Sequence, residues 1–314
     1  MITPGDMNVT GNTRERFVHF VEALQVFICT ALEEVDGQSL FKEDAWERKE
    51  GGGGLTRVLE NGKVFEKAGV NTSGVHGSLS PQMQQTLNVT GSHFFACGLS
   101  IVIHPLNPFV PTVHANWRYF ELYDEKDQRT DAWFGGGSDL TPYYLFPEDG
   151  RHFHLALKTA LDEFGMDLYP SYKKQCDEYF VNRHRNNEAR GIGGIFYDYL
   201  RPADENQEDK LLRFQFANGN AFLPSYLPIV QKRLHHSYGE SELLWQEIRR
   251  GRYAEFNLIH DRGTLFGLKT NGRTESILMS LPPRARWLYD HHPVDGSREA
   301  TLLEYLRPRD WVNE

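Results

Sequence analysis

The chain has 314 residues, of which 39% are hydrophobic and 25% charged, with a formal net charge of −9. This composition is typical of a globular protein and excludes disordered, collagen-like and disulfide-scaffold classes. The acidic total argues against a nucleic-acid-binding protein, which needs a basic surface. The cysteines at Cys29, Cys97 and Cys176 lie far apart without a CxxC pair, so we expect buried free thiols in a reducing compartment.

The longest strongly apolar run covers residues 94–103, well short of the about 20 residues of a membrane span, so no integral membrane segment is expected. The first residues show no basic patch followed by an apolar stretch, which predicts no signal peptide and a cytoplasmic location. No linker or repeat divides the chain. We therefore expect a flexible N-terminus, 1–13, and one domain, 14–314.

Helical periodicity predicts several helices in chain order. The first follows Asn12 and Glu15, which have the pattern of a capping box, and its apolar residues run from Phe17 to Leu32 on one face. Three more helices are expected, one from Pro147 to Gly165, one from Pro170 through Phe180, and one over Ser241–Arg250 that stops at Gly251.

Between these helices, strands are expected at 55–60, 63–66, 99–104, 113–123, 253–259 and 264–269. The first two flank Asn61-Gly62, the strongest short hairpin signal. Consecutive strands joined by short turns predict an antiparallel sheet. Because the helices come in blocks and do not alternate with strands, the fold class is α+β.

Three glycine-rich segments carry little specific information. Gly51–Gly54 is not followed by Lys-Ser/Thr, so it is no P-loop, and 191–194 lacks the glycine spacing of a dinucleotide fingerprint. Gly135–Gly137 suits either a tight turn or a close approach of the backbone to a ligand, and its local pattern favours the turn. Asp139 just beyond is either a turn residue or a buried carboxylate.

Polar side chains gather on the two strands at 99–104 and 113–123. Because strand side chains alternate between faces, Ser100 and His104 share one face, and His114, Asn116 and Arg118 share one face of the next strand. If the strands are neighbours, this surface suits an anion-binding, proton-transferring pocket. The alternative is a solvated sheet face with scattered polar residues.

Two further histidines, His154 and His184, lie on expected helices. Each residue of this kind is more often a core or helix-end histidine than a metal ligand. Together with His104 and His114 they make four histidines, but no short ligand spacing argues for a metal site.

Longer stretches match a known family in the same order along the chain. They are Trp46-Glu47-Arg48 with Gly51–Gly54, Val64–Asn71, His104-Pro105 through His114–Arg118, Trp133–Gly137 with Asp139–Pro142, Arg190–Phe196, Tyr253 with Glu255–Leu258, Asp261–Thr264 and Met279–Pro283. On these segments the chain resembles the oxygen-dependent coproporphyrinogen III oxidase family, from about Arg14 to the C-terminus.

The departures from the family pattern are local. They are Gln175 and His260 where the family usually has Trp, Tyr197 and Tyr199 in a Phe-Phe-Asp-Asp pattern, Asn271 in place of a glycine, and one extra residue within 186–189.

The resemblance implies a single domain with a large antiparallel sheet flanked by helices on both faces, and a homodimer formed through about Tyr253–Leu288. It implies oxidative decarboxylation of two propionates of coproporphyrinogen III to vinyls, giving protoporphyrinogen IX, with O2 as acceptor and CO2 and H2O2 as products. No metal or organic cofactor is expected. Some bacterial members are described with a metal, at positions matching His104, His114, His154 and His184.

The substrate's chemistry assigns roles to residues at the matching positions. Arg118 and Arg273 are expected to bind its carboxylates, Asp139 to accept from its pyrrole N–H groups, and His114 to donate or accept a proton. The predicted catalytic residues are His114, Asp139 and Arg118, and the predicted substrate-binding residues are Ser100, Asn116, Trp117, Arg118, Asn271, Gly272 and Arg273. The alternatives are a metal-dependent hydrolase using the four histidines and a non-catalytic tetrapyrrole-binding protein.

Overall fold

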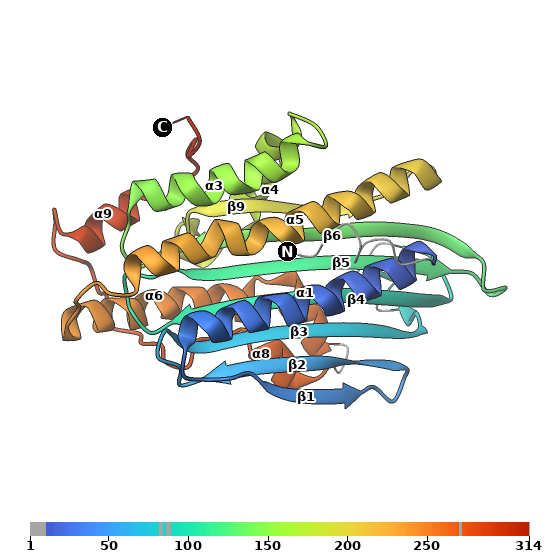
Figure 1. The fold of residues 1–314 in the computed structure, drawn as a ribbon, viewed down its shortest axis with the longest axis horizontal. Coiled ribbons are helices and arrows are strands. Elements are labelled where there is room, and N and C mark those ends of the chain that lie inside the picture. The colour runs from blue at the N-terminus through green and yellow to red at the C-terminus, as the bar shows by residue number, and fades with distance from the viewer. Residues whose placement is uncertain (1–10, 82–83, 86–88, 270–271, 314) are drawn as a thin grey trace.

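The computed structural model describes residues 11–81, 84–85, 89–269 and 272–313. Its centre is a seven-stranded antiparallel sheet with the order β1-β2-β3-β4-β5-β6-β9 (Figure 1). The strands are β1 (Lys42–Glu47), β2 (Gly52–Glu60), β3 (Phe65–Ser78), β4 (His93–Pro105), β5 (Thr112–Tyr123), β6 (Arg129–Thr141) and β9 (Gly193–Leu200). A small separate ribbon pairs β7 (Val181–Asn182) with β8 (Glu188–Ala189).

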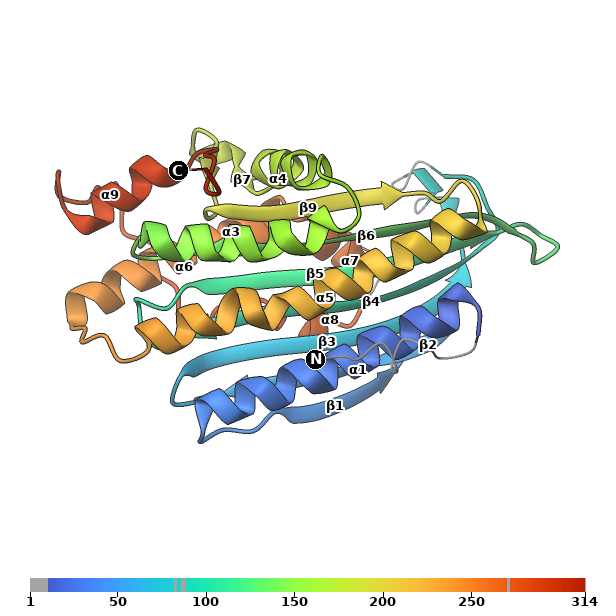
Figure 2. The same cartoon turned by 45° about the horizontal axis from the view of Figure 1, so that its top comes forward.

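Helices cover both faces of the sheet, which confirms the α+β fold class. They are α1 (Thr13–Asp36), α3 (Pro147–Asp162), α4 (Leu168–Tyr179), α5 (Glu205–Arg233), α6 (Glu240–Ile259), α7 (Arg262–Lys269), α8 (Thr274–Leu278) and α9 (Arg298–Tyr305). Helices α1, α3 and α5 lie over one face and α6, α7 and α8 lie behind the other (Figures 1 and 2), while α4 packs on edge strand β9. No helix in the described part of the chain has the length and apolar character to span a bilayer.

The main core lies between the sheet and the α1/α5 layer. Phe17 of α1 packs against Tyr119 and Phe134 of the sheet, and Trp117 of β5 meets Phe222 of α5 edge-on at 6.1 Å. Because β5 side chains alternate, burying 117 and 119 here turns positions 114, 116 and 118 toward the opposite face. Core packing on one face therefore positions the polar residues on the other.

Several predicted elements are confirmed. Both bonds of the capping box form, since Asn12 Oδ1 accepts from Glu15 N and Glu15 Oε2 accepts from Asn12 N, each at 3.0 Å. The β2–β3 hairpin turns at Asn61, whose φ is +57°. Helix α3 begins at Pro147 as expected but ends at Asp162, short of Gly165. Within the expected N-terminal segment, residues 1–10 lie outside the described residues.

The strands predicted at 253–259 and 264–269 are wrong, because these residues form the end of α6 and α7. Tyr253 and Phe256 are both buried three residues apart, a spacing that fits a helix. Gly251 does not stop α6. A Cβ at this position would lie 2.9 Å from the carbonyl oxygen of Arg286, so the glycine permits a close approach within the helix.

Two further expectations differ from the structure. Gly135–Gly137 is no turn but the middle of β6, where the missing side chains let neighbouring groups approach closely. Helix α5 was not predicted, because Pro224 and Pro228 interrupt its pattern. Burial of Phe222, Tyr226 and their neighbours in the core compensates for the backbone hydrogen bonds that these prolines remove.

Candidate active site

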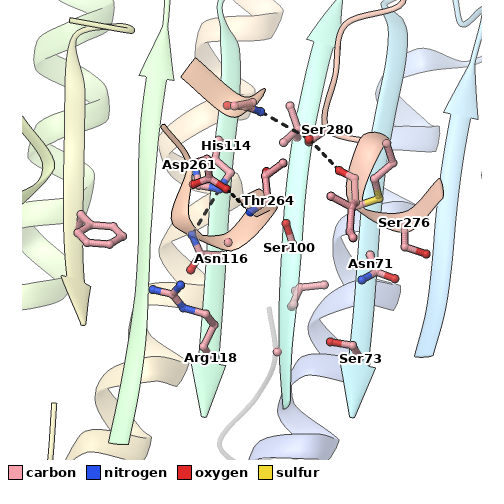
Figure 3. Close-up of a pocket in the computed structure, with 18 of the residues that line it drawn as sticks. Asn71, Ser73, Ser100, His114, Asn116, Arg118, Asp261, Thr264, Ser276 and Ser280 are labelled. Atoms are coloured by element: carbon pink, nitrogen blue, oxygen red, sulfur yellow. Dashed lines mark hydrogen bonds between the residues drawn. The ribbon is translucent and has the colours of Figure 1, made fainter. Parts of the chain in front are cut away.

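A cavity of about 270 Å³ lies on the face of β4 and β5 opposite the buried side chain of Trp117. We call it the front cavity. The register places Ser100 opposite Asn116 and Val102 opposite His114, so the two polar strands are neighbours, which was the condition for the predicted pocket. Ser100, His114, Asn116 and Arg118 all line this cavity, together with Asn71 and Ser73 of β3 (Figure 3). The polar sheet face is therefore a pocket wall rather than a solvated surface.

The opposite wall comes from residues within 257–264 and 276–280, in and beside α6, α7 and α8. Asp261, Thr264, Ser276 and Ser280 face the strands across the cavity (Figure 3). Asp261 fixes the α6–α7 junction, because its Oδ2 accepts from Thr264 N at 2.7 Å and its Oδ1 accepts from the Tyr179 hydroxyl at 2.9 Å. The sequence analysis did not predict that these residues line the site, although the segments that contain them were among those matching the family.

His114 is held from behind by Asp139. The His114 Nδ1 lies 2.7 Å from Asp139 Oδ1, and Asp139 is 1% exposed. Burial alone raises the pKa of Asp139, but the charge of Arg190 and the bond from His114 outweigh it, so the pKa is below its ordinary value. The carboxylate is thus ionised and can only accept. The Nδ1 therefore carries the proton, which leaves Nε2 for the cavity.

Arg190 completes this group, and the site prediction did not include it. Its Nη2 donates to both oxygens of Asp139, at 2.8 and 2.7 Å, and its Nη1 donates to Asn257 Oδ1 at 2.9 Å. The buried guanidinium lies 4.1 Å from the ring centre of Phe180. The only sequence feature that pointed to Arg190 was its position at the start of the segment Arg190–Phe196, which matches the family. The local sequence around an arginine does not predict which carboxylate it will pair with.

This arrangement changes the expected position of Asp139. The carboxylate lies behind His114 and already receives hydrogen bonds from His114 and Arg190. It does not line the cavity beside Ser100 and Asn116. In this structure Asp139 orients the imidazole; its predicted contact with pyrrole N–H groups stays a prediction.

Arg118 and Asn116 line the cavity and carry buried polar atoms without a hydrogen-bond partner among the described residues. In the part of the chain that the structure describes, Nε and Nη2 of Arg118 and Oδ1 of Asn116 have no hydrogen-bond partner. The nearest carboxylate to Arg118 is that of Asp198, at 3.6 Å, too long for a hydrogen bond. Donors in this state favour an anionic group that a substrate supplies.

The other predicted binding residues lie apart from this wall. Trp117 is in the core on the opposite face of β5 and does not line the cavity. Arg273 and Gly272 line an adjoining cavity of about 600 Å³, where Arg273 forms an ion pair with Asp44. Asn271 lies outside the described residues. The two cavities share the residues Asn71, Ser73, Ser276 and Ile277, so one large ligand that spans both reaches Arg118 and Arg273.

The four histidines do not form a metal site in this structure. His104 contacts the Ser280 carbonyl oxygen at 2.9 Å, and His154 contacts the Ile192 carbonyl oxygen at 3.1 Å. His184 lies between Glu255 and His260, at 2.9 and 2.8 Å. Across the described ranges, no three His, Cys, Asp or Glu side chains are grouped so that they hold a metal ion. These residues do not fit the metal suggested for some bacterial relatives.

The fold and the site together define an enzyme for a large anionic substrate. The sheet presents an oriented imidazole and a guanidinium in the wall of two adjoining cavities, of about 270 and 600 Å³. The family model described as coproporphyrinogen III oxidase matches residues 16–311, and the chain belongs to this family.

Individual relatives agree with this assignment. The chain is 53% identical over 300 residues to the rat protein named oxygen-dependent coproporphyrinogen-III oxidase, mitochondrial, covering 92% of this chain and 67% of that one. It is 51% identical over 320 residues to the human protein of the same name, covering 98% and 68%. With coproporphyrinogen-III oxidase 1, chloroplastic, of Arabidopsis thaliana it shares 47% over 322 residues, covering 99% and 82%.

Proposed function

We propose that this chain converts coproporphyrinogen III to protoporphyrinogen IX, with dioxygen as the electron acceptor. Each of two propionate groups loses its carboxylate as CO2 and one hydrogen from the CH2 attached to the pyrrole ring, and becomes a vinyl. The two electrons released reduce O2, which with one proton from solution and the lost hydrogen gives H2O2. The observation that carries the proposal is the Arg118 guanidinium in the same cavity wall as the Asp139-oriented His114, in a chain that belongs to this family.

The residues act by positioning and proton transfer. Arg118 lines the cavity with a side chain that is 41% exposed, and its guanidinium binds a propionate. His114 offers Nε2 toward the cavity for a proton of the reacting group, since Nδ1 is bonded to Asp139. The electron-rich pyrrole supplies the reducing power, so the protein needs to orient it and exclude water.

We propose that no metal or organic cofactor takes part. This rests on the substrate's own reducing power and on His104, His154 and His184. Ring nitrogens of these three histidines contact protein groups at separate places in the fold. Full activity after treatment with a chelator supports the proposal, and activity that is lost to chelator and restored by one metal contradicts it. That second result would favour the metal-dependent alternative.

The test of the reaction is an incubation with coproporphyrinogen III in air and in its absence. We expect vinyl product only in air, with CO2 and H2O2 formed in equal amounts. Arg118→Ala is expected to lower kcat/KM about 100-fold or more, because a charge-assisted contact to a carboxylate is lost. Arg151→Ala, at an exposed arginine of α3, is the control. Binding without turnover would instead favour a tetrapyrrole-binding protein.

We also propose a homodimer formed through about Tyr253–Leu288. Large apolar side chains are exposed in this segment, with Ile259 at 52% and Trp287 at 55%. A second copy of the chain that covers them removes this surface from water. Light scattering is expected to give twice the chain mass, and a monomer mass at micromolar concentration contradicts the proposal.

The cytoplasmic location stays a prediction. The rat, human and Arabidopsis relatives carry names that place them in mitochondria or chloroplasts. Fractionation of the source cells with an antibody to this chain tests the location directly.

A further inference from the structure

A second cavity, of about 240 Å³, lies behind the Asp139 carboxylate. Its outer end is formed by the exposed residues Asn187, Arg307 and Pro308, and its inner end by the buried residues Cys176, Ile192 and Asp139. The cavity therefore leads from the protein surface to the back of the catalytic group. We call it the rear cavity.

One side chain belongs to the linings of both the rear cavity and the front cavity, the one that Arg118 lines. Phe180, the residue after α4, lines both of them. Its ring lies 5.8 Å from the ring centre of His114 and 4.1 Å below the Arg190 guanidinium. The two cavities therefore approach each other at this ring, beside the imidazole.

The buried charges along the rear cavity are paired with one another. Asp139 is bonded to Arg190 and His114, and Asp177 is bonded to Lys173 at 2.5 Å. Burial raises the pKa of the Cys176 thiol well above its ordinary value, so this group is neutral. The remaining buried lining is apolar. Apart from the exposed Arg307 at its outer end, the described lining of the rear cavity thus offers no unpaired charge to an ion, and the buried part suits a small uncharged molecule.

The proposed reaction needs such a molecule after the substrate has bound. The front cavity, about 270 Å³, is filled by the ring that presents its propionate to Arg118. Dioxygen must still reach that ring, and it partitions readily into apolar space. We propose that the rear cavity is the route by which dioxygen reaches the substrate beside His114. This inference rests on the proposed function.

The turn at the outer end supports an opening of fixed shape. Asn186 and Asn187 both have left-handed backbones, with φ of +53° and +60°. This turn joins η1 (Arg183–Arg185) to β8 and places Asn187 at the outer end of the rear cavity. Asparagine tolerates this backbone better than most residues, so the rim keeps its shape without a glycine.

The test fills the rear cavity without touching the front one. Ala189→Phe places a ring into it from β8, and Ala203→Phe, at an exposed position before α5, is the matched control. Initial rates are measured against oxygen concentration. We expect kcat/KM for dioxygen to fall about fivefold or more in Ala189→Phe, while KM for the tetrapyrrole and kcat at saturating oxygen stay within about twofold. An unchanged oxygen dependence in the folded variant overturns the proposal.

Crystals of the wild-type protein pressurised with xenon give a second readout that does not depend on activity. We expect xenon between Cys176, Val181 and Ile192, and an absence of xenon there would contradict the proposal. A pH–rate profile that shifts in Asp177→Asn, with normal oxygen dependence in Ala189→Phe, would assign the rear cavity to protons and overturn it as well. If the wild type makes no vinyl product in air, the proposed function itself fails. Vinyl formation with unchanged oxygen dependence overturns only the route.

Discussion

Asp139 is the residue on which the catalytic group depends, because its buried carboxylate is bonded to both His114 and Arg190. Asp139→Asn keeps the shape but removes the charge that orients His114 and neutralises Arg190. We expect kcat to fall about 100-fold or more, since the imidazole loses its fixed tautomer and orientation. We also expect the free energy of unfolding to fall by about 3–5 kcal/mol, because Arg190 remains buried without its partner.

The measurements are the initial rate of vinyl formation and urea unfolding followed by circular dichroism. Asp131→Asn is the control, since Asp131 pairs with Arg201 in a more exposed place. Wild-type kcat in Asp139→Asn would show that the carboxylate does not position the imidazole.

At this scale the sequence predicted part of the site and missed part. His114, Asn116 and Arg118 were predictable together, since strand alternation fixes their common face without any knowledge of the rest of the fold. Arg190 was not, because its contact with Asp139 joins residues 51 positions apart through a strand pairing that no local pattern encodes. The direction of the Asp139 side chain depends on the same pairing.

At the scale of elements, the spacing of apolar residues predicted the secondary structure correctly where it fitted only a strand or only a helix. It failed where the spacing fitted both. The strand at 113–123 alternates cleanly, and β5 has nearly these bounds. The stretch 253–259 satisfies both a period of two and the helical spacing over a short window, and the helix wins because α6 extends far beyond it. The helix on the cavity wall was therefore mistaken for a strand.

The glycines of β6 provide a prediction about a strand that serves the site. A Cβ on Gly135 would lie 2.7 Å from Asp198 Oδ1 and 3.1 Å from Arg118 Nη2, both ends of side chains. Gly135→Ala is therefore expected to displace Arg118 and raise KM about tenfold, with little change in Tm. Gly137→Ala is the contrast, because its Cβ would lie 2.5 Å from the Ile195 carbonyl oxygen, which is backbone.

For Gly137→Ala we expect the larger fall in Tm, since the β6–β9 pairing must shift. Steady-state kinetics and thermal unfolding of both variants separate the two effects. An unchanged KM in Gly135→Ala would contradict the role of this strand in positioning the guanidinium.

For the whole molecule, the sheet divides two tasks between its faces. The α1/α5 side buries the large aromatic core, while the α6–α8 side encloses the front cavity and keeps polar groups (Figures 1 and 3). This division needs the helices of the second layer, which the sequence did not fully reveal. It also buries a histidine on each side of the sheet, His104 beside Tyr253 of α6 and His154 in α3. The protonation of these two side chains links global stability to pH.

Burial, with the charges of Arg250 and Lys173 respectively, lowers the pKa of His104 and His154, the latter to about 3 from an ordinary 6.5. A histidine with a lowered folded pKa is protonated first in the unfolded chain. Its contribution to stability is therefore full above about pH 6.5 and is lost as the pH falls toward the folded pKa. Each of the two is expected to lower the free energy of unfolding by about 1.4 kcal/mol per pH unit between about pH 6 and 5.

His154→Gln removes one of these groups, so we expect it to reduce that slope by about one proton, or about 1.4 kcal/mol per pH unit, whatever its effect on stability at neutral pH. The measurement is urea unfolding at several pH values above about 5, where carboxylates with lowered pKa values such as Asp139 and Glu255 are still ionised. His292→Gln is the control, because that side chain is 80% exposed. A slope in His154→Gln equal to that of the wild type would mean that His154 is protonated equally in the folded and unfolded chains, and that its burial between Tyr169 and Ile192 does not oppose the charge.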